Sequence, residues 1–156
     1  MPKRKTWTEK LHDSKGLPKV DKISPKMSKR WGTGTLVVPA PLEVREVMRQ
    51  VPKGKVTTIN EVRAFLAKKH GANIGCPITT GIFAWVAANA AEEDRQRGEK
   101  EITPYWRTLK VGGVINEKYP GGVEAQKELL EREGHVIAKK GKRFLVLGYE
   151  KFLAEL

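Results

Sequence analysis

Residues 103–122, TPYWRTLKVGGVINEKYPGG, are the stretch that decides the fold of this 156-residue chain. An alanine-rich segment with apolar residues at helical spacing precedes the stretch, and a second helical segment follows it. The apolar runs 106–109 and 114–115 predict a β-hairpin that turns at 111–113. The YPGG sequence at 119–122 predicts a turn immediately before the next helix.

Helical spacing of apolar residues predicts three helices upstream of this stretch. The first covers 41–50, where Pro41 suits the first turn. The second covers 59–70 and follows the capping-box sequence TINE at 58–61, with Val62, Phe65 and Leu66 on its inner face. The third begins at Pro77 and ends near residue 94.

The third helix has two kinds of surface. Its expected core face holds residues at spacings of three and four, namely Ile78, Ile82, Trp85, Val86 and Asn89. The rest of the helix is small, with threonine, glycine and alanine side chains, and a small surface lets another backbone approach closely. Two helices joined by a short loop, the second one small-faced, are typical of a helix-turn-helix and also of two packed core helices.

Downstream of the deciding stretch, the pattern predicts an amphipathic helix over 123–133 that ends at Gly134. A second hairpin is expected from strands at 135–138 and 144–147, and a short tail helix at 151–156. Three helices followed by a hairpin predict a mainly α fold with small β structure. The expected fold is a winged helix with a C-terminal β-hairpin.

Charge divides the chain into two predicted parts. The net charge is +12, which indicates a polyanionic partner such as nucleic acid. Residues 1–33 hold ten Lys and Arg against three Asp and Glu, with three prolines and few large apolar residues. This composition predicts a basic, largely disordered arm over 1–33 and a folded domain over 34–156. The arm suits either electrostatic binding of nucleic acid or a solubilising extension.

Several classes of protein are excluded by composition. The longest apolar runs are far shorter than the ~18 residues of a membrane span, and the N-terminus lacks the apolar core of a signal peptide. A cytoplasmic, nucleoid-associated location is therefore expected. The single cysteine, Cys76, excludes an internal disulfide. With one Cys and three His, neither a structural zinc site nor any cofactor is expected.

Ordered motifs over 38–134 resemble the DNA-binding domain of the alkylguanine-DNA alkyltransferases. VPKGKVTT at 51–58 is similar to the segment that leads into that family's helix-turn-helix, and the small-faced helix is similar to its recognition helix. Pro104 and Arg107 stand where the family's active-site tetrad begins and ends. YPGG at 119–122 and LLEREG at 129–134 resemble the segments that follow. The resemblance implies a winged-helix protein that binds double-stranded DNA as a monomer.

The reactive residues of that family are replaced in this chain. Tyr105 stands in the position of the acceptor cysteine and Trp106 in that of the histidine, while Glu133 matches the glutamate. A phenol with a pKa near 10 is a poor nucleophile at neutral pH. We therefore expect no catalytic residues and no enzyme activity. The chain is similar in this respect to the cysteine-less branch, the alkyltransferase-like proteins, which bind alkylated DNA and present it to nucleotide excision repair.

The resemblance also implies two sets of site residues. The expected DNA contacts are Thr57, Thr58, Ile59, Ile78, Thr79, Thr80, Gly81, Asn89, Arg107 and Lys110. The expected lesion pocket is formed by Tyr105, Trp106, Tyr119, Gly121 and Gly122. Ile78 aligns with the family's arginine finger and Ile59 with its phosphate-contacting tyrosine, so base flipping lacks both side chains.

Three alternatives remain at this point. Thr58 suits a helix cap, and Arg107 suits a role in holding the hairpin, as well as DNA contact. The fold also suits a scaffold for a protein partner, in which Trp85, Tyr105 and Trp106 pack against that partner. Finally, Cys76 at the start of the third helix is a candidate nucleophile for residual alkyl transfer.

Overall fold

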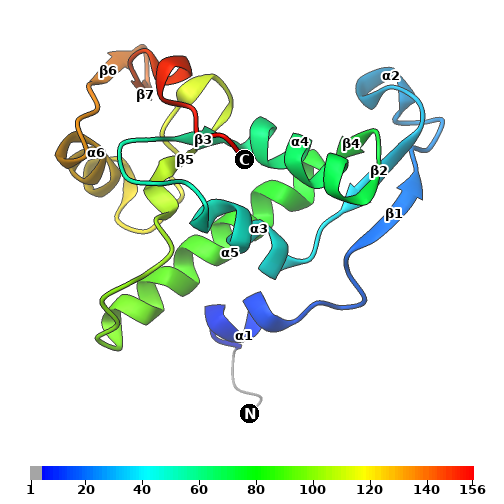
Figure 1. Cartoon of the computed structure of the whole chain (residues 1–156), viewed down its shortest axis with the longest axis horizontal. Helices are drawn as coiled ribbons and strands as arrows, with labels where there is room; N and C mark the ends of the chain where they lie inside the picture. Colours follow the sequence, from blue (N-terminus) through cyan, green and yellow to red (C-terminus); the bar gives the residue numbers. More distant parts are fainter. Residues whose placement is uncertain (1–4) are drawn as a thin grey trace.

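The computed structural model describes residues 5–156 and places three helices at the centre of the molecule. α3 (Pro41–Arg49), α4 (Ile59–His70) and α5 (Pro77–Gln96) pack on one another around a large apolar cluster (Figure 1). Val44, Val47, Val62 and Leu66 are fully or almost fully buried in this cluster. The three helices predicted from apolar spacing are confirmed, and α5 is two residues longer than expected at its end.

The ends of α3 and α4 follow from local chemistry. Pro41 occupies the first turn of α3, and the Glu43 carboxylate accepts a hydrogen bond from the Ala40 amide at 3.1 Å. At α4 the predicted capping box is altered, because the Thr58 hydroxyl bonds to the Glu61 carboxylate instead of a backbone amide. Gly71 ends α4 in the left-handed conformation that favours glycine.

The predicted core face of α5 is confirmed at Val86, which is buried, and is wrong at its three largest residues. The side chains that α5 buries are small, chiefly Thr80, Ala84, Ala87, Ala88 and Ala91. Ile78, Ile82 and Trp85 are instead 58%, 47% and 37% exposed. The small face is the inner one because α3 and α1 both pack against α5, and short side chains let these helices approach its backbone.

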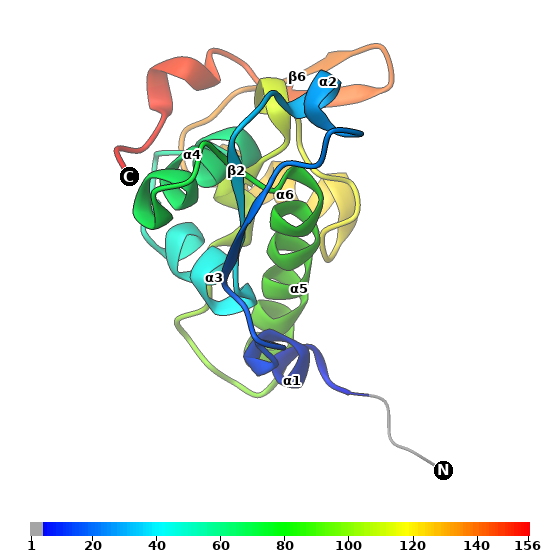
Figure 2. The ribbon, with the colours of Figure 1, turned by 90° about the vertical axis from the view of Figure 1, so that its right-hand side faces the viewer.

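The predicted disorder of residues 1–33 is not confirmed over the described residues 5–33, and residues 1–4 lie outside them. α1 (Trp7–His12) packs along the second half of α5 and buries Leu11 (Figure 2). β1 (Lys19–Lys22) pairs antiparallel with β2 (Thr35–Val38), which pairs parallel with β4 (Ile74–Gly75). α2 (Ser28–Trp31) lies between β1 and β2 in the chain. This segment is ordered because Leu11 is buried against the helices, Ile23 packs with Leu36 and Cys76, and β1 pairs with β2.

The deciding stretch does not form the predicted hairpin over 106–115. After a 3₁₀ turn, η1 (Tyr105–Arg107), strand β5 (Thr108–Leu109) pairs in parallel with β3 (Thr57–Thr58). A second 3₁₀ turn, η2 (Val111–Gly113), closes through a single bridge between Lys110 and Val114. Because β5 pairs in parallel with a strand 51 residues earlier, no local pattern indicates this pairing. Of the predicted hairpin, the turn at 111–113 is confirmed.

The C-terminal third forms a smaller unit beside the helices. α6 (Gly122–Arg132) and the hairpin of β6 (Ile137–Lys140) and β7 (Arg143–Val146) confirm the helix and hairpin expected there. The predicted tail helix at 151–156 is wrong. The chain forms a 3₁₀ turn, η3 (Tyr149–Phe152), and then bridges in extended form to Val56, whose amide and carbonyl both bond to it.

A second apolar cluster lies under these elements. Val56, Leu109, Ile115, Leu130 and Val146 are its buried members. Trp106 packs against both this cluster and the cluster of the central helices. Over residues 5–156, no helix is long and apolar enough to cross a membrane.

Candidate functional site

The outer face of α5 borders a shallow hollow of about 480 Å³, which we name the α5 groove. Its floor is largely apolar, although it lies at the surface of the protein. Contiguous exposed apolar surface on a monomer marks an interaction site more often than isolated apolar residues do. The groove residues are Ile59, Ile78, Gly81, Ile82, Trp85, Lys110, Asn116, Glu117 and Lys118.

Hydrogen bonds fix the walls of the groove. The Trp85 indole N–H donates to the Lys118 carbonyl at 3.2 Å, which ties α5 to the 116–118 segment. Gln126 of α6 holds that segment in turn, because its side-chain amide donates to the Asn116 carbonyl at 2.6 Å. On its other side Trp85 meets the edge of Trp7, with ring centroids 4.6 Å apart. The exposed tryptophan is therefore positioned from three elements.

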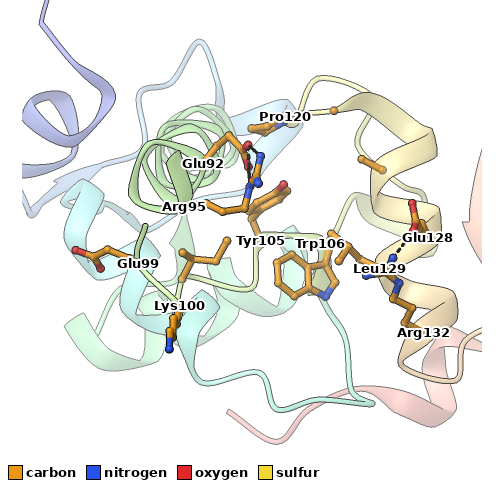
Figure 3. A pocket seen from close by; sticks show the side chains of 13 residues that line it. Glu92, Arg95, Glu99, Lys100, Tyr105, Trp106, Pro120, Glu128, Leu129 and Arg132 are labelled. Atoms are coloured by element: carbon orange, nitrogen blue, oxygen red, sulfur yellow. Dashed lines mark hydrogen bonds and ion pairs between the residues drawn. The ribbon is translucent and has the colours of Figure 1, made fainter. Parts of the chain in front are cut away.

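A second hollow, of about 500 Å³, lies between the end of α5 and α6 (Figure 3). We name it the Tyr105 cavity, because the Tyr105 and Trp106 rings lie at its centre, with Leu129 on the α6 side. Charged side chains surround these rings. Arg95 donates to Glu92 at 2.9 Å on one side, and Arg132 pairs with Glu128 on the other.

The two tyrosines of this region are held as neutral phenols. Burial raises the pKa of Tyr105, and the nearby Glu92 carboxylate raises it further. The Tyr105 ring meets the edges of Trp106 and Tyr119, at centroid distances of 5.3 and 6.0 Å. Burial also raises the pKa of Tyr119, and it outweighs the opposing effect of the Asn116 side chain. Neither phenol is therefore a source of phenolate at neutral pH.

Behind the cavity, Glu133 accepts hydrogen bonds from two successive residues. Arg107 donates to it through Nε at 2.9 Å and through a terminal nitrogen at 2.7 Å, and the Trp106 indole donates at 3.2 Å. Burial opposes ionisation of Glu133, but these hydrogen bonds outweigh burial and lower its pKa. A further Arg107 nitrogen donates to the Val51 carbonyl at 2.9 Å. This network locks η1 onto the end of α6.

The same arrangement of elements is found in known DNA complexes. No protein-family model matches the sequence, and no curated protein matches it. Solved structures do match it. One is S. pombe Atl1 in complex with damaged DNA containing O6-carboxymethylguanine, with a TM-score of 0.51 and 20% identity over 74% of this chain and 94% of that one. Another is S. pombe ATL in complex with DNA, with a TM-score of 0.53 and the same identity and coverage.

The chain has the fold of the alkyltransferase-like proteins. The resemblance predicted from the ordered motifs is confirmed at the level of the fold. At 20% sequence identity, this similarity shows the arrangement of the elements. The roles of individual residues follow from the geometry of this chain.

Within the alkyltransferase-like fold, the predicted DNA contacts separate into groups. Ile59, Ile78, Gly81 and Lys110 line the α5 groove together. Asn89 lies farther along α5, where its side-chain amide donates to the Trp85 carbonyl at 2.9 Å. The groove also contains Ile82, Trp85 and Lys118, which the sequence pattern did not assign to the site.

The four predicted threonine contacts do not expose their hydroxyls at the surface of the protein. Thr57, Thr58 and Thr80 are buried, and the hydroxyl of the partly exposed Thr79 is enclosed. Thr57 and Thr58 form β3 in the interior, and Thr80 lies on the small inner face of α5. Thr58 instead bonds to Glu61 at the start of α4, as the helix-cap alternative anticipated in part.

Arg107 also lies outside the lining of the groove. Its side chain is 14% exposed, and its nitrogens are occupied by Glu133 and Val51. This geometry corresponds to the alternative in which Arg107 holds the local structure. Lys110 is exposed and lies 3.3 Å from the Glu117 carboxylate, so its charge is at the rim of the groove.

Three of the five predicted pocket residues line the Tyr105 cavity, namely Tyr105, Trp106 and Gly121. Tyr119 lies behind the Tyr105 ring, and Gly122 begins α6 outside the cavity lining. The charged residues of the cavity were missed because 92–101 was interpreted as a solvated run. The pattern that indicates them is the spacing of three between Glu92 and Arg95, which places both on one side of the lengthened α5.

Cys76 is buried in the interior of the protein. It precedes the first turn of α5, is 6% exposed and packs with Ile23 and Leu36. It lines neither the α5 groove nor the Tyr105 cavity. Among residues 5–156, no group of three or more His, Cys, Asp or Glu side chains is arranged to hold a metal ion.

Proposed function

We propose that this protein binds duplex DNA through the α5 groove and receives an alkylated base in the Tyr105 cavity, without transferring the alkyl group. One observation carries the proposal. The segment 116–121 forms a wall of both hollows, since Asn116 and Lys118 line the groove while Pro120 and Gly121 line the cavity. A base displaced from a duplex on the groove therefore has an adjacent, partly aromatic cavity to enter.

The chemistry of the groove suits a duplex. Ile78 and Ile82 supply apolar side chains of the kind that wedge between base steps in the minor groove. Lys110 and Lys118 stand at the rim, where lysines contact phosphates and position a protein without reading sequence. The net charge of +12 favours such contacts. The fold is that of S. pombe proteins solved in complex with DNA, in one case with damaged DNA.

The absence of alkyl transfer follows from Tyr105. Its phenol has a raised pKa, the nearby Glu92 carboxylate is paired with Arg95, and Trp106 uses its indole N–H to bond Glu133. We expect intact-mass measurement after incubation with a duplex containing O6-methylguanine to show unmodified protein. A methyl adduct on Cys76 would instead support the residual-enzyme alternative, and an adduct on Tyr105 would contradict our interpretation of the cavity.

The decisive experiment is a titration of two dye-labelled duplexes, one plain and one with a single O6-alkylguanine, followed by anisotropy. Both are measured at about 50 mM and about 200 mM salt, a range over which phosphate contacts weaken strongly. We expect tighter binding of the alkylated duplex, and weaker binding of both duplexes at the higher salt. Equal, salt-sensitive affinities would retain DNA binding and remove lesion recognition.

A protein partner is the second candidate function, because Ile78, Ile82 and Trp85 form an exposed apolar cluster that suits a protein interface. Failure to bind either duplex at low salt would favour this scaffold function. Under the first proposal, the bound protein is a monomer that presents the lesion to nucleotide excision repair proteins.

A further inference from the structure

The C-terminal hairpin carries a concentrated positive charge beside the α5 groove. Lys139, Lys140, Lys142 and Arg143 surround its turn, and all four are exposed. The sixteen residues 134–149 include no Asp or Glu. Within residues 5–156, none of these four cations forms an ion pair with a carboxylate. The hairpin is therefore an uncompensated cationic ridge, which we name the β6–β7 ridge.

The ridge is continuous with the groove. Arg143 lines a hollow of about 390 Å³ together with Ile59, Lys110, Val111 and Val114. Ile59 and Lys110 line the α5 groove as well, so the two hollows adjoin along these residues. An extended ligand lying in the groove and continuing past Ile59 would meet Arg143.

The register of the hairpin decides which cations face this hollow. Lys140 is the direct partner of Arg143 across the hairpin, and Lys139 is the partner of Phe144. Direct partners in an antiparallel pair point to the same face of the sheet, and successive residues point to opposite faces. Lys140 therefore shares the face of Arg143. Lys139 shares the face of Phe144, which packs on the second apolar cluster.

The ridge is held firmly to the body of the protein. The Ile115 amide donates to the Phe144 carbonyl at 2.8 Å, and Val114 bridges to Leu145. Val146 at the end of β7 is fully buried. Because the turn at 111–113 and the hairpin are bonded together, Lys110 and Arg143 keep a fixed relation. Preorganised cations lose less conformational freedom on binding than mobile ones.

We infer that Lys140 and Arg143 bind the sugar-phosphate backbone of duplex DNA beyond the α5 groove. The inference rests on the proposed DNA binding and extends the interface to the hairpin. A duplex presents two backbones, one on each side of the groove that faces the protein. The ridge stands where one of them continues past Ile59. Such contacts contribute affinity without sequence preference.

The test compares the salt dependence of binding to a plain duplex for three proteins. They are the wild type, the double variant K140Q/R143Q and the matched control K15Q/K68Q, which removes the same charge from two exposed lysines that line neither hollow. Each lost phosphate contact lowers the slope of log K against log salt by about 0.9. We expect the slope of K140Q/R143Q to fall by about 1.8 and that of the control to stay at the wild-type value.

Two further controls distinguish the loss of phosphate contacts from a loss of folding. The conservative variant K140R/R143K should keep the wild-type slope, and circular dichroism should show equal melting temperatures for all variants because the side chains are exposed. Equal slopes for K140Q/R143Q and K15Q/K68Q would overturn the inference while leaving DNA binding in place. No binding by the wild type would overturn the proposed function and the inference with it. If K140Q/R143Q melts early, the single variant Arg143→Gln replaces it, and an unchanged slope then counts against the inference.

Discussion

Glu133 is the residue that joins the two halves of the protein. It accepts hydrogen bonds from Trp106, which packs on both apolar clusters, and from Arg107, which also bonds the end of α3 through Val51. Its side chain is 8% exposed, so its charge depends on these partners. In this protein Glu133 therefore serves structure, although the sequence resemblance matches it to a glutamate among the reactive residues of that family.

We expect Glu133→Gln to destabilise the protein by roughly 3–5 kcal/mol, the usual cost of removing one partner from a buried ion pair. The pKa of Glu133 is lower in the folded protein than in the unfolded chain. Its stabilisation is thus present above the unfolded pKa of about 4.3 and is lost as pH falls through the folded value. Urea unfolding at several pH values should show a flatter acid limb for Glu133→Gln.

The control for this prediction is Glu131→Gln, which changes an exposed carboxylate in the last turn of α6, two residues before Glu133. It should cost less than about 0.5 kcal/mol, as surface substitutions usually do. Equal losses for the two variants would show that the Glu133 network does not stabilise the fold.

Gly81 illustrates a conflict between stability and binding. It lies inside α5, and a Cβ added there would meet no atom within 4 Å. Gly81→Ala should therefore stabilise the protein by about 0.5–1 kcal/mol, because alanine loses less entropy in a helix than glycine does. The added methyl projects into the α5 groove and should weaken DNA binding.

Thermal unfolding and the duplex titration together check the Gly81 prediction. Gln96→Ala at the far end of the same helix is the control, and its DNA affinity should equal that of the wild type. A Gly81→Ala variant that melts higher and binds as tightly as the wild type would remove Gly81 from the interface.

At the scale of elements, α5 is where prediction from sequence failed most instructively. Its bounds followed from spacing, but its large apolar residues were assigned to the core, and the structure places them outside. In this helix small residues face α3 and α1, so size, not hydrophobicity, distinguishes the two faces. No sequence pattern states how many helices will pack against one face, and that number decided the outcome.

Substitutions on the two faces of α5 test this reversal. Ala87 is fully buried, and Ala87→Leu should cost about 1–3 kcal/mol because the added methylenes have no space. Ile82→Leu, which adds no carbon and lies on the exposed face, should cost well under 1 kcal/mol. Denaturant midpoints of the two variants measure the difference, and a costlier Ile82→Leu would restore the original assignment of the core face.

The other elements were predictable where their contacts are local in the chain, and were not predictable where they pair with distant segments. The β6–β7 hairpin was predictable because its turn and both strands lie within ten residues. The pairing of β3 with β5 and the extended tail against Val56 were not, since each joins segments far apart in the chain. The sequence indicated part of the candidate site, namely Ile59, Ile78, Gly81, Lys110, Tyr105 and Trp106. It missed Ile82 and Trp85, because their exposure depends on which face of α5 packs against α3 and α1.

At the scale of the whole molecule, residues 5–33 belong to the fold. Leu11 and Ile23 are buried, and β1 covers one edge of β2. Burying two large aliphatic side chains contributes about 3–6 kcal/mol, which is a large share of the ~5–15 kcal/mol that stabilises a typical domain. The predicted boundary at residue 34 therefore cuts through packed structure.

We expect a chain truncated to residues 34–156 to unfold at a much lower urea concentration than the full chain. The full-length variant L11A/I23A should reproduce a large part of the loss, because it removes the same buried side chains without shortening the protein. Coincident midpoints for the truncated and full chains would show that 34–156 is an independent domain.

The positions of two tryptophans give the protein a built-in optical reporter. Of the four in the chain, Trp85 borders the α5 groove and Trp106 lines the Tyr105 cavity. A nucleobase stacked on an indole quenches its emission, so unlabelled protein should signal duplex docking through Trp85 and base capture through Trp106. Trp85→Phe and Trp106→Phe would each silence one signal, and the order in which the two signals change would time the steps of recognition.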